Sequence, residues 1–297
     1  MEPTVIQDLG EFYGNHLFIK REDLIPYSFG GNKARKGILF FQDVDKGNYD
    51  SVVTYGSSHS NHCRVIANLA AERGIDSVII GPEEVSDQTF NSQMMKLFGS
   101  KIITVPVNRV HDAIEEKLTE LKNNGKTPYF IPGGGHGNIG TEAYVQCYEE
   151  IRKQGQFDYI FFASGTGTTH AGLVCGKLIN NGSEQIVGIS IARKNPRGRQ
   201  VVLDSIREYM GDDERANDAT IFIDDYTGAG YGKENTEIKQ TIIEVLVRYG
   251  IPLDATYTAK AFNGMQTYIQ KQGIKGMKIL FIHTGGTPLF FDNMKVL

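Results

Sequence analysis

Cysteines, basic runs and long apolar runs are all scarce in this 297-residue sequence. Its three cysteines, Cys63, Cys147 and Cys175, lie far apart, which disfavours a disulfide framework or a metal site. The net charge is -4 without a basic run, and this disfavours nucleic acid or an anionic membrane as a partner. The apolar runs are too short for a membrane span, and residues 1–3 do not begin a signal peptide. We therefore expect a cytoplasmic protein.

Short β-branched runs alternate with longer helical patterns along most of the chain. This alternation predicts an α/β fold with mostly parallel sheets covered by helices on both faces. The expected strands are 17–20, 51–55, 77–80, 101–105, 128–131, 159–163, 186–191, 220–223 and 278–282. The expected helices are 31–45, 61–73, 87–98, 113–123, 141–154, 168–179, 200–209, 233–249 and 258–270.

Glycine-rich loops follow several of the expected strands. They occupy residues 56–58, 132–135, 164–167, 228–232 and 284–286. In open α/β sheets, ligands bind just outside the carboxyl ends of the strands, where the strand order switches. One such loop is weak evidence because glycine-rich turns are routine in α/β folds. The set of loops predicts a shared cleft.

The stretch SFGGNKARK, residues 28–36, places Lys33 at the start of an expected helix. Gly30 and Gly31 allow a tight turn before it and leave the helix start open to a ligand. A partly desolvated lysine can form an imine with a carbonyl compound, because desolvation favours the neutral amine. Taken alone, the stretch fits an ordinary solvated lysine better, since lysines are seldom buried.

A second motif, FFASGTGTTHAG at residues 161–172, carries an apolar strand into glycines and threonines and then into a helix. Backbone N–H groups and threonine hydroxyls at such a helix start form a ready anion site. The motif lacks the P-loop lysine, and no acidic residue ends the next strand as in dinucleotide-binding folds. We expect a small phosphorylated ligand here, with a plain tight turn as the alternative.

The segment Ser60, Asn61 and His62 also follows a strand and begins a helix. Ser60 and Asn61 are good helix-capping residues. The same hydroxyl, amide and free N–H groups can also converge on a ligand carboxylate. The local sequence does not separate these two roles.

Three tyrosines, Tyr226, Tyr231 and Tyr257, lie in or beside loops on the inferred ligand side of the sheet. The ordinary role of a tyrosine is packing, with its hydroxyl bonded to a neighbour. The functional alternative is a phenol that acts as acid or base, or a ring stacked on a flat cofactor. Near the C-terminus, Thr284 can offer a neutral hydroxyl to a ring nitrogen.

In this order the motifs resemble the fold-type II (tryptophan-synthase-β-like) pyridoxal-phosphate (PLP) enzymes, in the branch of D-cysteine desulfhydrase and 1-aminocyclopropane-1-carboxylate (ACC) deaminase. The matching pieces are RED at 21–23, GGNKARK at 30–36, SNH at 60–62, SGTGTTHAG at 164–172, GAGYG at 228–232, YT at 257–258 and HTGG at 283–286. They span essentially the whole chain, and GGNKxRK followed by SNH is specific. Together they make the imine interpretation of Lys33 the preferred one.

The resemblance implies pyridoxal 5'-phosphate as cofactor. Lys33 would hold it covalently and exchange the Cα proton of the substrate. Asn61 would bond the ring hydroxyl, and Ser60, Asn61 and His62 would bind the substrate carboxylate. By the same resemblance, the catalytic residues would be Lys33, Ser60, Tyr257 and Tyr231.

The remaining cofactor contacts also follow from the resemblance. Tyr257 would stack near the ring, Tyr231 would line the substrate side, and Thr284 would meet the ring nitrogen. The phosphate would lie in a cradle formed by Gly165, Thr166, Gly167, Thr168 and Thr169.

Two features favour the desulfhydrase side of this branch. ACC deaminases place an acidic residue after the tyrosine that corresponds to Tyr257, whereas this chain has Thr258. With Thr284 as a neutral partner, the ring is a weaker electron sink, which suits elimination of a β leaving group better than opening of a cyclopropane. His62 is likewise typical of the desulfhydrases.

We therefore expect a PLP-dependent lyase or deaminase that acts on a small amino acid by β-elimination, similar to D-cysteine desulfhydrase, giving a keto acid and ammonia. β-Replacement and racemisation with the same cofactor stay open, and ACC deamination is disfavoured. Outside this class, a non-catalytic protein that binds a phosphorylated metabolite is the alternative.

Two loops depart from the family pattern, GSSH at 56–59 and GGHGN at 134–138. They are expected to bring His59 and His136 to the substrate side, with His136 as a substrate-binding residue. A larger or more polar amino acid than cysteine is therefore compatible with the site.

The resemblance and the alternation of strands and helices together predict two three-layer α/β/α domains with the PLP cleft between them. Residues 1–45 and 153–297 would form the larger, PLP-binding domain, and residues 46–152 a smaller inserted domain. A homodimer is expected from the family alone.

Overall fold

The protein is described by a computed structural model that covers residues 1–85, 88–226 and 236–294. Its larger sheet has six strands in the order β1-β2-β10-β7-β8-β9. Within it β1 and β2 pair antiparallel and all other neighbours pair parallel. The strands are β1 (Ile6–Phe12), β2 (Asn15–Lys20), β7 (Tyr159–Ser164), β8 (Gln185–Ser190), β9 (Ile221–Ile223) and β10 (Lys278–Ile282).

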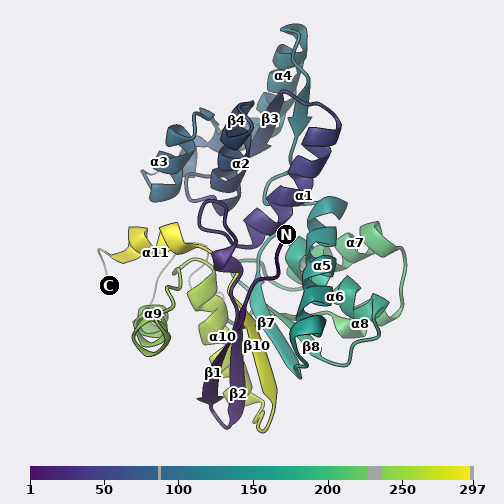
Figure 1. The fold of residues 1–297 in the computed structure, drawn as a ribbon, viewed down its shortest axis with the longest axis vertical. Helices are drawn as coiled ribbons and strands as arrows, with labels where there is room; N and C mark the ends of the chain where they lie inside the picture. The colour runs from purple at the N-terminus through teal and green to yellow at the C-terminus, as the bar shows by residue number, and fades with distance from the viewer. Residues whose placement is uncertain (86–87, 227–235, 295–297) are drawn as a thin grey trace.

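The smaller sheet has four parallel strands in the order β5-β4-β3-β6. Figure 1 shows it in the upper part of the molecule, whereas β1, β2, β7, β8 and β10 lie in the lower part. The strands are β3 (Ser51–Tyr55), β4 (Asp76–Pro82), β5 (Lys101–Val105) and β6 (Pro128–Phe130).

Helices cover both sheets. Their bounds are α1 (Asn32–Lys46), α2 (Asn61–Glu72), α3 (Phe90–Leu97), α4 (Val110–Asn123), α5 (Asn138–Gln154), α6 (Thr168–Ile179), α7 (Arg197–Met210), α8 (Arg215–Ala219), α9 (Thr236–Tyr249), α10 (Thr258–Lys271) and α11 (Thr287–Asn293). Short 3-10 turns, η1 (Glu22–Leu24), η2 (Glu83–Val85) and η3 (Val107–Arg109), complete the order.

The two-residue period of β7 explains how the larger sheet is buried on both faces. Phe161 packs in a cluster with residues of α9 and α10. The next residue, Phe162, packs in a second cluster with residues of α5, α6 and α7. A strand that is apolar on both sides therefore lies between two helical layers, as parallel sheets require.

The predicted α/β class with mostly parallel sheets is confirmed, and every expected strand corresponds to one of β2 to β10. Strand β1 was not predicted, because its residues, IQDLGEF, contain no continuous apolar run. A register shift between Asp8 and Gly10 also interrupts its pairing with β2. The short helices α8 and α11 were missed as well, since each is too brief to show a helical period.

Two helices show how the chain passes between the sheets. On α1, Phe40, Phe41 and Val44 belong to the cluster that includes Val52 of β3 and residues of α2. On α5, the buried side chains pack with β7, β8 and β10 instead. The expected domain limits at 45/46 and 152/153 stay a prediction. By their packing, α1 belongs with the smaller sheet and α5 with the larger one.

Helix α1 is anchored by a buried charge cluster. Arg35 donates to Glu22 through Nη2 at 2.7 Å and lies 3.0 Å from Glu150 of α5. Glu150 also pairs with Lys20 of β2, and the Tyr144 hydroxyl donates to Glu22 at 3.2 Å. Burial opposes ionisation of Glu22, but the charge and hydrogen bonds of Arg35 outweigh it, so the pKa of Glu22 lies below its ordinary value.

The substitution Glu22→Gln tests this anchor. It leaves Arg35 without its main counter-charge in the interior, so we expect the free energy of unfolding to fall by about 3 kcal/mol. The control is Asp212→Asn, which breaks the exposed pair of Asp212 with Arg207 and should cause no measurable change. Urea unfolding of both variants measures the difference, and equal effects would show that the cluster is not an anchor.

Candidate active site

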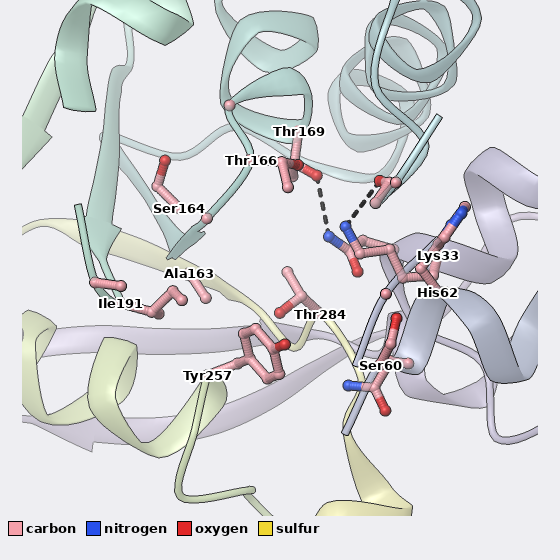
Figure 2. A pocket seen from close by; sticks show the side chains of 18 of the residues that line it. Lys33, Ser60, His62, Ala163, Ser164, Thr166, Thr169, Ile191, Tyr257 and Thr284 are labelled. Atoms are coloured by element: carbon pink, nitrogen blue, oxygen red, sulfur yellow. Dashed lines mark hydrogen bonds between the residues drawn. The ribbon is translucent and has the colours of Figure 1, made fainter. Parts of the chain in front are cut away.

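The glycine-rich loops at the carboxyl ends of both sheets enclose a cavity of ≈ 480 Å³. The loops after β3, β6, β7, β8 and β10 contribute to its wall, together with the first residues of α1 and α2. Figure 2 shows Lys33 and Ser60 on one side and Ser164 and Ile191 on the opposite side. The shared cleft is therefore present, although the expected loop 228–232 lies outside the described residues.

Lys33 projects from the first turn of α1 into this cavity. The chain reaches it through Gly31, where φ is 93° and a Cβ would lie 2.6 Å from the carbonyl oxygen of Thr284. Only glycine fits such a close approach. The Lys33 amine donates to the carbonyl oxygen of Gly134 at 2.9 Å. Burial lowers the pKa of this amine from 10.5 to about 8, so the neutral, nucleophilic form is accessible near neutral pH.

The start of α6 lies beside Lys33 and can bind an anion. Its first-turn N–H groups have no acceptor within the helix. Asn32 Nδ2 donates to Thr169 Oγ1 at 3.1 Å, as Figure 2 shows. Of the predicted cradle, Gly165, Thr166, Gly167 and Thr169 line the cavity, whereas Thr168 is buried just behind it.

Lys36 lies beside the cavity without lining it, and it was not predicted from the sequence. It is fully buried, and its amine donates to Thr168 Oγ1 at 2.6 Å. Within the described ranges no carboxylate forms an ion pair with it. Burial and the positive charge of Lys33 hold the pKa of Lys36 well below its ordinary value. The signal was the spacing of Lys33 and Lys36, which places both amines on one helix face.

These residues fit a phosphorylated aldehyde. Lys36 and the start of α6 supply the positive charge and N–H groups that a phosphate needs. Lys33 supplies a neutral amine for a carbonyl carbon. No aspartate or glutamate is among the described residues of the cavity wall, so the positive charge there is not balanced by the wall itself. Pyridoxal phosphate carries both of the required groups.

Ser60 and Asn61 combine capping with exposure to the cavity. Ser60 Oγ accepts from the N–H of Cys63 at 3.1 Å and so caps α2. Both Ser60 and Asn61 line the cavity at the open start of this helix. The structural and the ligand-binding roles are therefore compatible at this turn.

His62 borders the cavity, but its side chain is buried and one ring nitrogen is bonded within the protein. Its Nε2 lies 2.9 Å from Thr54 Oγ1, while its Nδ1 is buried and has no hydrogen-bond partner among the described residues. Burial and the charges of Lys33 and Lys36 hold the pKa of His62 well below its ordinary value. The ring is therefore neutral at physiological pH.

Tyr257 and Thr284 both line the cavity (Figure 2). Asp254 accepts from the N–H of Tyr257 at 2.7 Å and from the Thr258 hydroxyl at 2.8 Å, which fixes the entry of the chain into α10. Thr258 is buried and does not line the cavity. The carbonyl oxygen of Thr284 accepts from the N–H of Asn32 at 3.0 Å and ties this loop to α1.

Other predicted residues are not brought into the described cavity wall. His59 and His136 are half-buried outside it. Tyr226 packs against the core of the larger sheet, and Tyr231 lies outside the described residues. Arg193, in the loop after β8, was not predicted but lines the cavity and donates to the carbonyl oxygen of Gly165.

The lowered pKa of Lys33 predicts a pH dependence. The neutral fraction of the amine should reach one half near pH 8, where an ordinary lysine with a pKa of about 10.4 is almost fully protonated. Competitive acetylation of cofactor-free protein, followed by mass spectrometry from pH 6 to 11, measures this fraction, with exposed Lys153 as internal reference. A Lys33 profile that coincides with that of Lys153 would contradict the burial argument.

Comparisons with known proteins agree with this geometry. Residues 3–285 match the family described as "Pyridoxal-phosphate dependent enzyme". A "Putative 1-aminocyclopropane-1-carboxylate deaminase" of Pyrococcus horikoshii is 37% identical, over 96% of this chain and 87% of the relative. A "D-cysteine desulfhydrase" of Yersinia enterocolitica is 32% identical, over 95% of this chain and 90% of the relative.

A solved structure shows the same relationship in three dimensions. The crystal structure of an "ACC deaminase homologue" has a TM-score of 0.88 and 33% sequence identity, and the alignment covers 99% of this chain and 93% of that one. Because sequence and structure agree over nearly the full length, the chain belongs to the fold-type II pyridoxal-phosphate-dependent enzymes, in the branch of D-cysteine desulfhydrase and ACC deaminase, with pyridoxal 5'-phosphate as its cofactor.

Proposed function

We propose that this enzyme eliminates a β leaving group from a small amino acid and releases a keto acid and ammonia, in the manner of a D-cysteine desulfhydrase. The observation that carries the proposal is the lack of an acid in the described cavity wall: no carboxylate is among its described residues, and Thr284 supplies a hydroxyl. A neutral partner does not hold a proton on the ring nitrogen as a carboxylate would. A less electron-withdrawing ring suits loss of a good β leaving group better than cleavage of a cyclopropane.

The residues of the chain would bind the substrate and move its proton. When bound, the cofactor supplies an electron-withdrawing group conjugated to the substrate Cα. Ser60 and Asn61, at the open start of α2, would bind the substrate carboxylate. Lys33, whose neutral form is accessible because burial lowers its pKa to about 8, would take the Cα proton as a general base. Tyr257 would stack near the cofactor ring, and Thr284 would meet the ring nitrogen.

ACC deamination is the second candidate, because several Pyrococcus relatives with at least 33% identity carry the name putative ACC deaminase. The argument against it is Thr258, which bonds to Asp254 and presents no acid to the cavity. β-Replacement and racemisation would use the same residues as elimination. The alternative of a non-catalytic phosphometabolite-binding protein is not supported by the family assignment.

We further propose the domain division, dimer and location given by the resemblance. Residues 46–152 would form the smaller domain and residues 1–45 with 153–297 the larger one, with the cavity between them. The proposals of a homodimer and of a cytoplasmic location rest on the family alone. Each helix that the structure describes is too short or too polar to cross a bilayer. His136 as a substrate contact stays a prediction, since it lies outside the described cavity wall.

A panel of D- and L-amino acids tests the proposed reaction. With D-cysteine or another amino acid that carries a β leaving group, purified enzyme should form keto acid and ammonia, measured by a coupled dehydrogenase assay. Lys33→Ala should lose the visible absorption band of the bound cofactor and at least about 1000-fold of the rate, because the attachment point and the base are removed together. Keto acid from ACC but from no β-substituted amino acid would refute β-elimination.

Lys36→Met tests the phosphate site. We expect the Kd for pyridoxal phosphate to rise roughly 10-fold to 100-fold, since a buried positive charge beside the start of α6 is lost. Stability of the cofactor-free protein should not fall, because an unpaired buried charge is removed with the amine. Pyridoxal without phosphate is the matched control and should bind wild type and variant alike in absorbance titrations. An equal loss for both ligands would contradict a phosphate contact.

A further inference from the structure

Arg64, in the first turn of α2, is a buried cation with no counter-ion among the residues that the structure describes. Its side chain is completely shielded from solvent, and within the described ranges no carboxylate forms an ion pair with it. Its Nη2 is buried and has no hydrogen-bond partner among the described residues. Arg35, the other buried arginine near the cavity, pairs with both Glu22 and Glu150. An unpaired buried charge is costly, so Arg64 calls for a functional explanation.

The hydrogen bonds of Arg64 connect three segments around Lys33. Its Nη1 donates to Asn61 Oδ1 at 2.6 Å and to Asn91 Oδ1 of α3 at 2.7 Å. Its Nε donates to Ser28 Oγ, in the loop before α1, at 3.2 Å. A single guanidinium therefore joins the loop of the lysine, the start of α2 and the start of α3.

These bonds determine how Asn61 faces the cavity. Asn61 Oδ1 accepts from Arg64 and also from Asn91 Nδ2 at 3.0 Å. A flipped Asn61 amide would place its NH₂ group against two donors, so the orientation is unambiguous. Asn61 lines the cavity, and its Nδ2 is the atom left to bond a ligand. It can therefore only donate there.

We propose that Arg64 is a positioning residue that locks Asn61 as a hydrogen-bond donor toward an anionic oxygen in the cavity, and that its buried charge is compensated when that oxygen binds. The oxygen belongs to the ring hydroxyl of the cofactor or to the substrate carboxylate. The inference rests on the cofactor assignment and deepens the proposed function, but it does not depend on which reaction follows.

The electrostatics of the region agree with this role. Burial lowers the pKa of Arg64 to about 9, and the nearby Tyr257 phenol opposes the shift. Arg64 therefore interacts with a second predicted cofactor residue besides Asn61. Because the surrounding medium is poorly polarisable, a positive charge there favours an anion in the cavity more strongly than a surface charge would.

A double-mutant cycle tests the proposal with Arg64→Met, Asn61→Ala and the combined variant. Absorbance titration of the full chain with pyridoxal phosphate gives one Kd for each protein. If Arg64 acts through Asn61 on the ring hydroxyl, each single variant should weaken cofactor binding about tenfold, and the double variant should be no weaker than Asn61→Ala. The spectrum of the bound cofactor should change alike in all three. Additive losses would overturn the proposal.

A second titration distinguishes the two possible oxygens. Glycine, which has no β leaving group, is added to the cofactor-loaded proteins, and its Kd is measured from the change in the visible band. Non-additive losses already in the cofactor titration assign the ring hydroxyl, and losses confined to the glycine titration assign the carboxylate. Additive losses in either titration, or no loss in both, overturn the role. These measurements record binding and need no turnover. A wrong assignment of the reaction would therefore leave their outcome unchanged.

Two further variants separate positioning from folding. Arg73→Met, at the end of the same helix, removes the exposed pair of Arg73 with Asp45 and should leave both Kd values unchanged. If Arg64→Met does not fold, Arg64→Lys serves in its place, because it keeps the charge but cannot bond both amide oxygens and Ser28. The same non-additivity with Asn61→Ala is then expected. An additive Arg64→Lys effect would again contradict the proposal.

Discussion

The buried pairing of Arg35 with Glu22 and Glu150 anchors the helix on which the site depends. Helix α1 packs its apolar residues against β3 and α2 and also contacts α5. Arg35 connects it to α5 and to the 3-10 turn after β2. Lys33 is thereby placed against the loop after β6, and Lys36 against the start of α6. A shift of α1 would move both amines together.

The second constraint is electrostatic. Lys33, Lys36 and Arg64 are removed from water around one cavity, and no carboxylate lines its described wall. In the interior an unpaired cation costs free energy. This region therefore favours the binding of anions. A phosphate, a ring oxygen and a substrate carboxylate together would meet it. Binding of cofactor and substrate would then offset a cost that folding of the chain alone incurs.

Much of the fold and part of the site were predictable from local sequence patterns. Apolar runs such as 159–163 and 278–282 predicted β7 and β10, because parallel strands buried on both faces need continuous apolar residues. β1 was missed, since its apolar residues are interrupted by polar ones and a bulge. Lys33 and the loop 164–169 were found through their glycines. Arg193 was not found, because the sequence does not show where the side chain of an arginine after a strand points.

The sequence by itself determined the alternation of strands and helices, the glycine-rich turns and the order of motifs that identifies the family. These are local properties, governed by backbone freedom and side-chain period. Only the tertiary structure decided which polar groups lose their water and which find partners. From the sequence, Lys36 and Arg64 look like ordinary helix residues. The packing of α1 against α5 and α6 buries Lys36, and the packing of α2 against α3 buries Arg64. Desolvation depends on every element that surrounds a side chain, and no single stretch of sequence contains that information.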